Sequence, residues 1–268
     1  MLLPIILALA FAAFKYLSAP TFTDAETGKK IRGGFSDEQG EALGLQSFQE
    51  VLRTEHVIQG GPSAELVTRV ATRLIRVVQQ KQPELKFDWK VSVVDSPQAN
   101  AFCLPGGKIV VYTGILPITA NEDGLAVVMG HEIAHAVLRH GSQRMLKTDM
   151  LNAVMQGASA AVTLGDMAPE QQRAVMGALG MGSKFGVLLP FSRGHETEAD
   201  ERGLIYAAAA GYNPQEAVAF WGRMAQAGGG QPAEFMSTHP SHSSRIEDLK
   251  RMMPRAMEEY QKAGGGRR

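Results

Sequence analysis

The chain has 268 residues, of which 44% are hydrophobic and 20% are charged, a balance that is typical of a globular protein with a buried core. Lys and Arg together number 27, as do Asp and Glu, so no net charge favours a nucleic acid or another strongly charged partner. The single cysteine, Cys103, excludes an intramolecular disulfide framework and a cysteine-rich metal cluster.

The N-terminal residues differ from the rest of the chain. Residues 2–17 are apolar except for Lys15, and Pro4 is the one interruption. This length falls between a signal-peptide core of roughly 7–15 residues and a spanning helix of about 20 residues. We therefore interpret residues 1–17 as a signal peptide or an N-terminal membrane anchor, with a buried helix as the alternative. Residues 18–35 lack periodicity and indicate a linker or an extended arm.

The sequence predicts two helices before the spacing of the apolar residues changes from the period of a helix to that of a strand. A capping box formed by Ser36 and Gln39 indicates the start of the first helix, and Gly60-Gly61 indicates the end of that unit. Pro62 in a first turn opens the second helix, which carries one apolar face. That face comprises Leu66, Val70, Leu74, Val77 and Val78.

Extended segments follow these helices. The alternation of apolar and polar residues from Phe87 to Val93 predicts a half-buried strand. Residues 101–104 and 108–113 are two further extended runs, and Pro105-Gly106-Gly107 between them indicates a hairpin. We therefore expect an α+β fold, in which a mostly helical domain over residues 36–255 contains a small sheet.

The remaining chain is predicted to be helical. One helix covers residues 123–140, where Gly141 would end it, and another runs from Gly194 to Ala210. Asn213-Pro214 would begin the next helix. Between the first two, residues 145–190 are rich in Met, Ala and Gly. This composition favours helices that pack against the core over a surface that contacts lipid or a partner.

The C-terminal part of the sequence contains several helix breakers. Gly228-Gly229-Gly230 indicates a flexible break, and Ser241 is a candidate cap for a last helix. Pro254 is predicted to interrupt that helix. Residues 256–268 end in three glycines and two arginines, and we predict a disordered tail.

The segment His131-Glu132-Ile133-Ala134-His135 lies within the predicted helix at 123–140. Two histidines four residues apart lie one turn apart on the same face, so both imidazoles can reach one ion. Zinc binds neutral imidazole nitrogen, and a catalytic zinc keeps one of its four positions open for water. Glu132 lies beside the two ligands, where it can take a proton from that water. Incidental histidines are the alternative, but the apolar surroundings would make two unpaired imidazoles costly.

The third zinc ligand is expected from a second helix. In Ser192-Arg193-Gly194-His195-Glu196-Thr197-Glu198-Ala199-Asp200, Glu196 and Asp200 are four apart and share a face. Glu196 can bind the metal while Asp200 accepts a ring N–H from a ligand histidine, which fixes its tautomer. His195 is the rival ligand, and Glu198 is predicted to be exposed on another face.

These two motifs resemble the membrane-linked gluzincin peptidases, which include the heat-shock peptidase HtpX and the CAAX prenyl-protein endopeptidase. Within that family the chain is most similar to the BepA/LoiP-like periplasmic peptidases. Further stretches that carry the resemblance are Asn100-Ala101-Phe102, Pro105-Gly106-Gly107-Lys108-Ile109, Gly211-Tyr212-Asn213-Pro214, and Thr238-His239-Pro240 with Arg245. The likeness covers residues 36–250. The sequence differs from the BepA-type pattern in lacking a C-terminal tetratricopeptide array, and from HtpX in lacking four spanning helices.

The resemblance implies peptide-bond hydrolysis by one Zn²⁺ per chain, with His131, His135 and Glu196 as ligands and Glu132 as the catalytic residue. A tetrahedral oxyanion needs a further donor, which His239 or Arg245 could supply. His239 could instead bind the zinc and displace the catalytic water. An extended or unfolded polypeptide is the expected substrate, pairing with the strand at Asn100, Ala101 and Phe102. His56, His140 and His242 are interpreted as surface or core residues.

The resemblance also implies a place in the cell envelope, on the periplasmic side and anchored to the membrane by residues 1–17, with a role in protein quality control. Basic residues after the apolar segment would instead favour a cytoplasmic body. Two other functions stay open. One is a zinc hydrolase for a non-peptide amide, and the other is a membrane-anchored chaperone or binding module with a latent zinc site.

Overall fold

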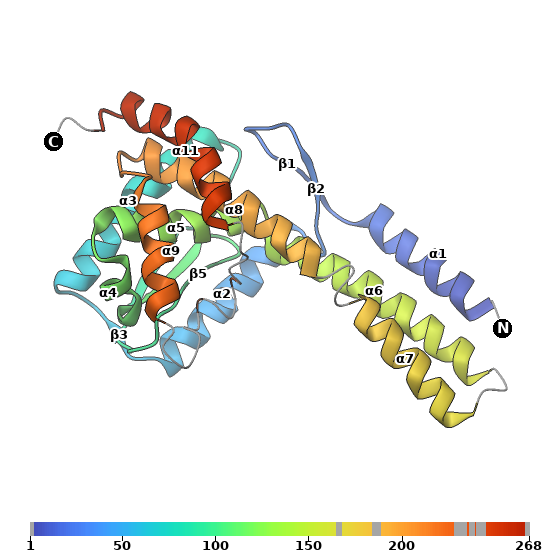
Figure 1. Cartoon of the computed structure of the whole chain (residues 1–268). Helices are drawn as coiled ribbons and strands as arrows, with labels where there is room; N and C mark the ends of the chain where they lie inside the picture. The colour runs from blue at the N-terminus through green and yellow to red at the C-terminus, as the bar shows by residue number, and fades with distance from the viewer. Residues whose placement is uncertain are drawn as a thin grey trace. The chain divides into compact units, whose positions relative to one another are not determined.

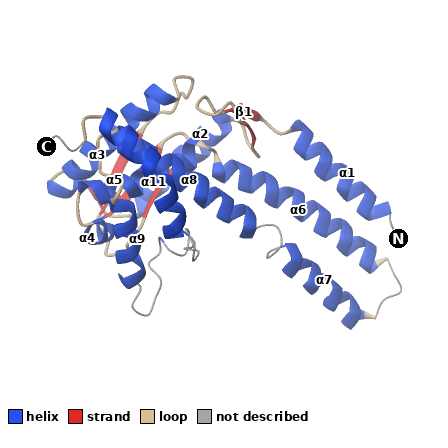
Figure 2. Ribbon diagram, turned by 45° about the horizontal axis from the view of Figure 1, so that its top comes forward, coloured by secondary structure: helices blue, strands red, loops and turns tan. Residues whose placement is uncertain are grey.

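The structure is a computed structural model that describes residues 3–164, 168–183, 189–227, 235, 239 and 245–265. Helices make up most of these residues, and two small β-sheets accompany them (Figure 2), which confirms the predicted α+β class. The chain forms two compact units. The first comprises residues 1–23, 29–36 and 139–194, and the second comprises residues 24–28, 37–138 and 195–268.

Within the described residues, the first unit contains helices α1, α6 and α7, the start of α8 and a short two-stranded sheet (Figure 1). Helix α6 (His140–Thr163) lies beside both α1 (Leu3–Ser18) and α7 (Pro169–Ser183). Strands β1 (Thr21–Thr23) and β2 (Lys30–Arg32) pair in antiparallel orientation, so the segment that we predicted to be a linker or an extended arm contains two short paired strands. The prediction that residues 145–190 pack against the core is also wrong, because α6 and α7 belong to this separate unit.

The second unit contains a four-stranded sheet in the order β3 (Val57–Ile58), β4 (Lys90–Val94), β6 (Lys108–Tyr112), β5 (Ala101–Leu104). Strands β4 and β6 are parallel, and the other two pairs are antiparallel. The hairpin of β5 and β6 is the predicted one. Strand β4 begins at Lys90 rather than at Phe87, because the Trp89 ring instead packs against Gly107 in the hairpin turn.

Helices cover both faces of this sheet. Helix α2 (Asp37–Thr54) packs Phe48 against Val94, Val110 and Tyr112 on one face. The larger core lies on the other face, where Val93, Ile109 and Val111 meet the helices. The helices that contribute to it are α3 (Pro62–Lys81), α5 (Glu122–Val137), α8 (Leu189–Ala209, from His195 onward), α9 (Glu216–Ala227) and α11 (Arg245–Lys262). The 3₁₀ turn Thr113–Ile115 and the short helix α4 (Leu116–Thr119) connect β6 to α5.

Several predicted helix boundaries are wrong. Helix α5 ends at Val137, and α6 begins at His140 after Arg139 adopts the left-handed conformation with φ 55°, so Gly141 lies inside a helix. Helix α8 begins at Leu189 instead of Gly194. Helix α9 begins at Glu216, after the Asn213-Pro214 turn.

Helix α11 continues through Pro254 to Lys262, so the tail predicted to be disordered from residue 256 is helical over most of its length. Buried Leu249 and Ala256 on either side of Pro254 anchor the helix to the core, and this packing overrides the local cost of proline. Ser241, His242 and Gly228-Gly229-Gly230 lie outside the described residues.

None of the helices within the described ranges has both the length and the apolar composition needed to traverse a lipid bilayer.

A buried ion-pair network joins the turn between β1 and β2 to α8 within the second unit. The Arg202 guanidinium donates to both carboxylate oxygens of Asp24 at 3.1 and 2.8 Å, and to Glu26 at 2.6 Å. Gln82 donates to Asp24 at 2.6 Å. Burial by itself raises the pKa of Asp24, but hydrogen bonds from Arg202, Thr27 and Gln82 hold it well below its ordinary value. The turn is therefore fixed by charge pairing rather than by apolar contacts.

Arg202→Ala should lower the free energy of unfolding by about 3–5 kcal/mol, because it leaves the Asp24 carboxylate buried and without its counter-charge. Urea denaturation at pH 7 measures this loss. Arg255→Ala is the control, since the Arg255–Glu201 pair is exposed and should contribute about 0–1 kcal/mol.

The pH dependence of that loss follows from the lowered pKa of Asp24. A depressed folded-state pKa contributes stability that is present above the unfolded value of about 3.9 and decreases as the pH falls below it. The difference between wild type and Arg202→Ala should therefore shrink below about pH 4. An unchanged difference at acidic pH would contradict this account.

Candidate active site

Helix α5 carries the first three residues of the site. Asn121 caps its N-terminus by accepting a hydrogen bond from the Gly124 backbone N–H at 2.8 Å, and the residues from Gly124 to Val137 are buried. His131 and His135 therefore lie one turn apart on a helix that the core holds on all sides. Their Nε2 atoms are 3.0 Å apart, and the rings meet edge to face. Two ring nitrogens converge on one point, as the spacing of the motif predicts.

Helix α8 brings Glu196 to the same point. The helices cross where Gly130 of α5 meets Gly203 of α8, and a Cβ on Gly203 would lie 2.5 Å from the His131 backbone nitrogen. No residue but glycine permits this approach without displacing one of the backbones. Glu196 Oε2 lies 3.4 Å from His131 Nε2, and Glu196 Oε1 lies 3.5 Å from His135 Nε2. His195 is also buried but lies outside this group.

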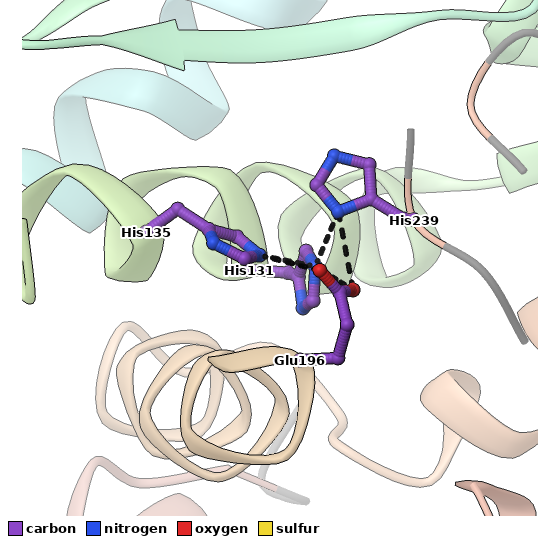
Figure 3. A group of neighbouring side chains, drawn as sticks. All are labelled: His131, His135, Glu196 and His239. Atoms are coloured by element: carbon purple, nitrogen blue, oxygen red, sulfur yellow. Dashed lines mark hydrogen bonds and ion pairs between the residues drawn. The ribbon is translucent and has the colours of Figure 1, made fainter. Parts of the chain in front are cut away.

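His239 completes the group from the C-terminal part of the chain (Figure 3). Its Nδ1 is 3.2 Å from His131 Nε2 and 3.2 Å from Glu196 Oε2. The Phe235 ring stacks on the His239 ring at 4.7 Å, and the His239 backbone N–H donates to the Phe235 carbonyl at 2.9 Å. The ring is thus held on one side by the protein and faces the two α5 histidines on the other.

The spacing of these four groups fits a metal ion. One atom from each of His131, His135, Glu196 and His239 lies within 4.8 Å of every other, and all four side chains are largely buried. Ligands about 2.0–2.1 Å from a tetrahedral zinc lie about 3.3 Å from one another. The contacts of 3.0 to 3.5 Å agree with that value. Three imidazoles and a carboxylate are also donors that zinc prefers.

Asp200 and Arg245 lie directly behind the four groups. His131 Nδ1 lies 2.9 Å from Asp200 Oδ1, so Nε2 is left to face the cluster. Arg245 donates two hydrogen bonds to the Asp200 carboxylate, both at 2.7 Å, and its Nη1 lies 3.2 Å from Glu196 Oε2. The Trp221 ring covers the Arg245 guanidinium at 3.7 Å. Arg245 therefore positions two carboxylates.

The ionisation of the site follows from these contacts. Burial by itself raises the pKa of Glu196, but hydrogen bonds from His131 and His239 outweigh this effect and hold the pKa below its ordinary value. Burial lowers the pKa of His131, and hydrogen bonds to Asp200 and Glu196 reverse this and raise it to about 9. For Asp200, the effect of burial is outweighed by the Arg245 charge, which lowers its pKa. Two carboxylates are therefore ionised beside the imidazoles, as metal binding requires.

Glu132 differs from the other carboxylates. Burial raises its pKa, and the nearby His239 and His131 only partly oppose this. Its Oε1 lies 3.4 Å from His239 Nε2, yet it has no hydrogen-bond partner among the described residues. A buried carboxylate oxygen with an open acceptor position beside a metal-ligating cluster can receive a proton from a bound water.

The predicted substrate strand lies next to this helix. Strand β5 packs beside α5 and forms the edge of the sheet, where β6 is its one strand neighbour among the described residues. Ala101 is buried, while Asn100 and Phe102 are half-buried. The geometry thus gives an available strand edge near the site.

Sequence comparison agrees with this geometry. The profile of Peptidase family M48 matches residues 63–253, a span that contains both helices of the site. The chain belongs to this family. This confirms the gluzincin resemblance that the two motifs indicated.

Members of the family from distant organisms are similar to the chain. Mitochondrial metalloendopeptidase OMA1 of Schizosaccharomyces pombe is 39% identical over 197 residues, which cover 73% of this chain and 54% of the relative. The Saccharomyces cerevisiae protein of the same name is 32% identical over 242 residues, covering 83% and 64%. Beta-barrel assembly-enhancing protease of Yersinia pestis is 30% identical over 228 residues, covering 84% and 46%. The chain thus spans about half to two thirds of the length of these relatives.

Part of this family site was not visible in the sequence. Gly130, Gly203, Trp221 and Phe235 support the cluster through backbone approach or ring contacts, and none of them stands in a motif that signals such a role. Glu198 is half-buried rather than exposed as predicted. Of the remaining histidines, His56 is exposed beside Asp95, and His140 is buried and is not one of the four converging groups.

Glu196→Ala should remove most of the zinc bound by the purified chain, because the one carboxylate among the four converging groups is lost. Metal analysis after dialysis against a weak chelator measures the zinc content. Glu201→Ala is the matched control on the same helix, since this side chain is exposed and pairs with Arg255. Full zinc occupancy in Glu196→Ala would show that Glu196 is not a ligand.

Proposed function

We propose that the chain is a zinc-dependent endopeptidase that binds one Zn²⁺ through His131, His135 and Glu196. The convergence of three buried donors from α5 and α8, with the Glu132 carboxylate beside them, is the observation that carries this proposal. Membership of the family and the metalloendopeptidase names of several relatives support it.

Each residue of the site has a separate role in the proposed reaction. A bound zinc would supply a Lewis acid that polarises the attacking water and the scissile carbonyl. Glu132 accepts the proton of that water and returns it to the leaving amine, since its Oε1 has an open acceptor position. Asp200 holds the tautomer of His131, and Arg245 holds Asp200 and Glu196 in place.

The proposed substrate is an extended or unfolded polypeptide. The free edge of β5 beside α5 would pair with its main chain at Asn100, Ala101 and Phe102, which gives affinity with little sequence preference. We further propose a role in envelope protein quality control on the periplasmic side of a membrane. The name of the Yersinia pestis relative, which refers to β-barrel assembly, supports this setting.

Glu132→Gln should retain zinc and the fold but lose casein hydrolysis by several orders of magnitude, because both proton transfers pass through this carboxylate. Fluorescent casein and metal analysis, applied to the same preparation, measure the two properties. Zinc retained with turnover unchanged would contradict the assignment. Activity confined to a non-peptide amide would instead favour a different hydrolase. No hydrolysis by either the wild-type chain or the His239→Ala variant would favour a chaperone or binding module.

We also propose that His239 is a fourth ligand that limits the activity of the site at rest. Its Nδ1 has the same spacing to His131 and Glu196 as a tetrahedral ligand would have. Its Nε2 lies 3.4 Å from Glu132 Oε1, which is where the water must approach the base. An imidazole bound in this position excludes the catalytic water.

His239→Ala should retain zinc and raise peptide hydrolysis several-fold, because the variant opens the fourth position to water. The measurement is turnover of a fluorogenic peptide per bound zinc. A fall of about a hundredfold would assign His239 to oxyanion stabilisation instead. Unchanged turnover would show that His239 has only a structural role.

A further inference from the structure

Strand β5 divides its side chains between two faces, as the period of a strand requires. Ala101 and Cys103 pack against the larger core on the side of α5, whereas Phe102 and Leu104 pack against Phe48 and its neighbours on the side of α2. Ala101 is 2% exposed, so the surrounding residues cover it. Cys103 is half-buried. On the α5 side of this strand, a molecule at the edge of the sheet can therefore reach the Cys103 side chain.

The main-chain groups of the same two residues point toward the edge of the sheet. The carbonyls of Asn100 and Leu104 accept hydrogen bonds from the β6 side of the hairpin, at 3.0 and 3.1 Å. Successive residues of an antiparallel strand alternate between bonding to the partner strand and pointing away from it. Ala101 and Cys103 therefore direct their N–H and C=O groups away from β6.

A main-chain donor pairs with this edge just before β5 begins. The Phe235 N–H donates to the Ala99 carbonyl at 3.2 Å, and Ala99 precedes Ala101 by one period of the strand. The edge thus accepts a main-chain hydrogen bond from a second segment of chain, as strand addition requires. A polypeptide that continues this pairing along β5 meets the main chain of Ala101 and Cys103 next.

The Cys103 thiol lies near the proposed base. Burial raises the pKa of this thiol, and the charge of the nearby Glu132 raises it further. The thiol is therefore neutral, and a neutral cysteine behaves as a small apolar side chain. Glu132 Oε1 is buried and has no hydrogen-bond partner among the described residues. Cys103 thus faces the side of β5 on which the base has its open acceptor position.

We propose that Cys103 determines which substrate side chain is accepted next to the scissile bond, and that it selects an uncharged apolar side chain. This inference rests on the proposed endopeptidase function. Side chains directly opposite each other on paired strands lie about 4.5–5.5 Å apart on the same face. The substrate residue opposite Cys103 therefore places its side chain on the α5 face of β5, beside Glu132. A larger residue at position 103 would occupy the space of that substrate side chain.

Peptides that differ in one residue test this assignment. The two residues on each side of the scissile bond of a fluorogenic peptide are changed one at a time between Ala and Phe, and kcat/KM is measured for each peptide. Cys103→Leu should lower the Phe-to-Ala ratio of kcat/KM at one of these positions by about tenfold, because added methylenes in a substrate site discriminate to this extent. Cys103→Ala should raise the ratio at the same position.

Leu104→Val is the matched control, because this side chain belongs to the same strand and packs on the α2 side. It should leave the Phe-to-Ala ratio at its wild-type value. A purely structural effect of a substitution at Cys103 would lower kcat/KM for all the peptides alike and would leave the ratio unchanged. Circular dichroism and zinc content confirm that each variant is folded.

The single thiol of the chain provides a second measurement that needs no turnover. In zinc-loaded Glu132→Gln, a saturating Phe peptide should slow the modification of Cys103 by iodoacetamide several-fold, as measured by mass spectrometry. Unchanged ratios in both Cys103 variants, or an unprotected thiol when fluorescence anisotropy shows the peptide bound, would overturn the assignment and leave the endopeptidase function intact. A protected thiol without peptide hydrolysis by wild type or His239→Ala would support the contact at Cys103 and contradict the endopeptidase function.

Discussion

The close approach of α5 and α8 is the constraint on which the site depends. Gly130 and Gly203 let the two backbones meet where any side chain would force them apart. This crossing lies next to His131, so the distance between the histidine pair and Glu196 is set by helix packing instead of by flexible loops. Functional groups on packed helices are held more precisely than groups on loops, and they cost less to organise when a metal binds.

The charges buried at this crossing explain why a divalent cation suits it. Glu132, Glu196 and Asp200 are three carboxylates in the core, and Arg245 is the one guanidinium among the described residues that is buried beside them. Fully ionised, they would leave two negative charges, and buried charges need a compensating partner. The raised pKa of His131 supplies part of this compensation through a proton. Zinc would supply two positive charges at the same point and release that proton.

Features that depend on neighbouring residues could be predicted from the sequence, whereas contacts between residues far apart in the chain could not. The spacing of His131 and His135 fixes their geometry because one helical turn relates them, and Pro105-Gly106-Gly107 predicts the hairpin through its own turn chemistry. Arg139, by contrast, adopts a left-handed conformation that nothing in its neighbourhood signals, so the break between α5 and α6 was missed. The separation of the first unit, the buried Asp24 turn and the ring of Trp221 over Arg245 arise from contacts between residues far apart in the chain. No local pattern encodes such contacts.

The central claim is that His131, His135, Glu196 and His239 meet at one zinc ion in the resting protein. X-ray absorption at the zinc edge of the purified full chain tests it most directly, because scattering from imidazole rings reports how many histidines bind the metal. The account predicts a four-coordinate zinc with three imidazole ligands and one carboxylate, and the loss of one imidazole in His239→Ala. A resting site with two imidazoles and bound water would contradict it.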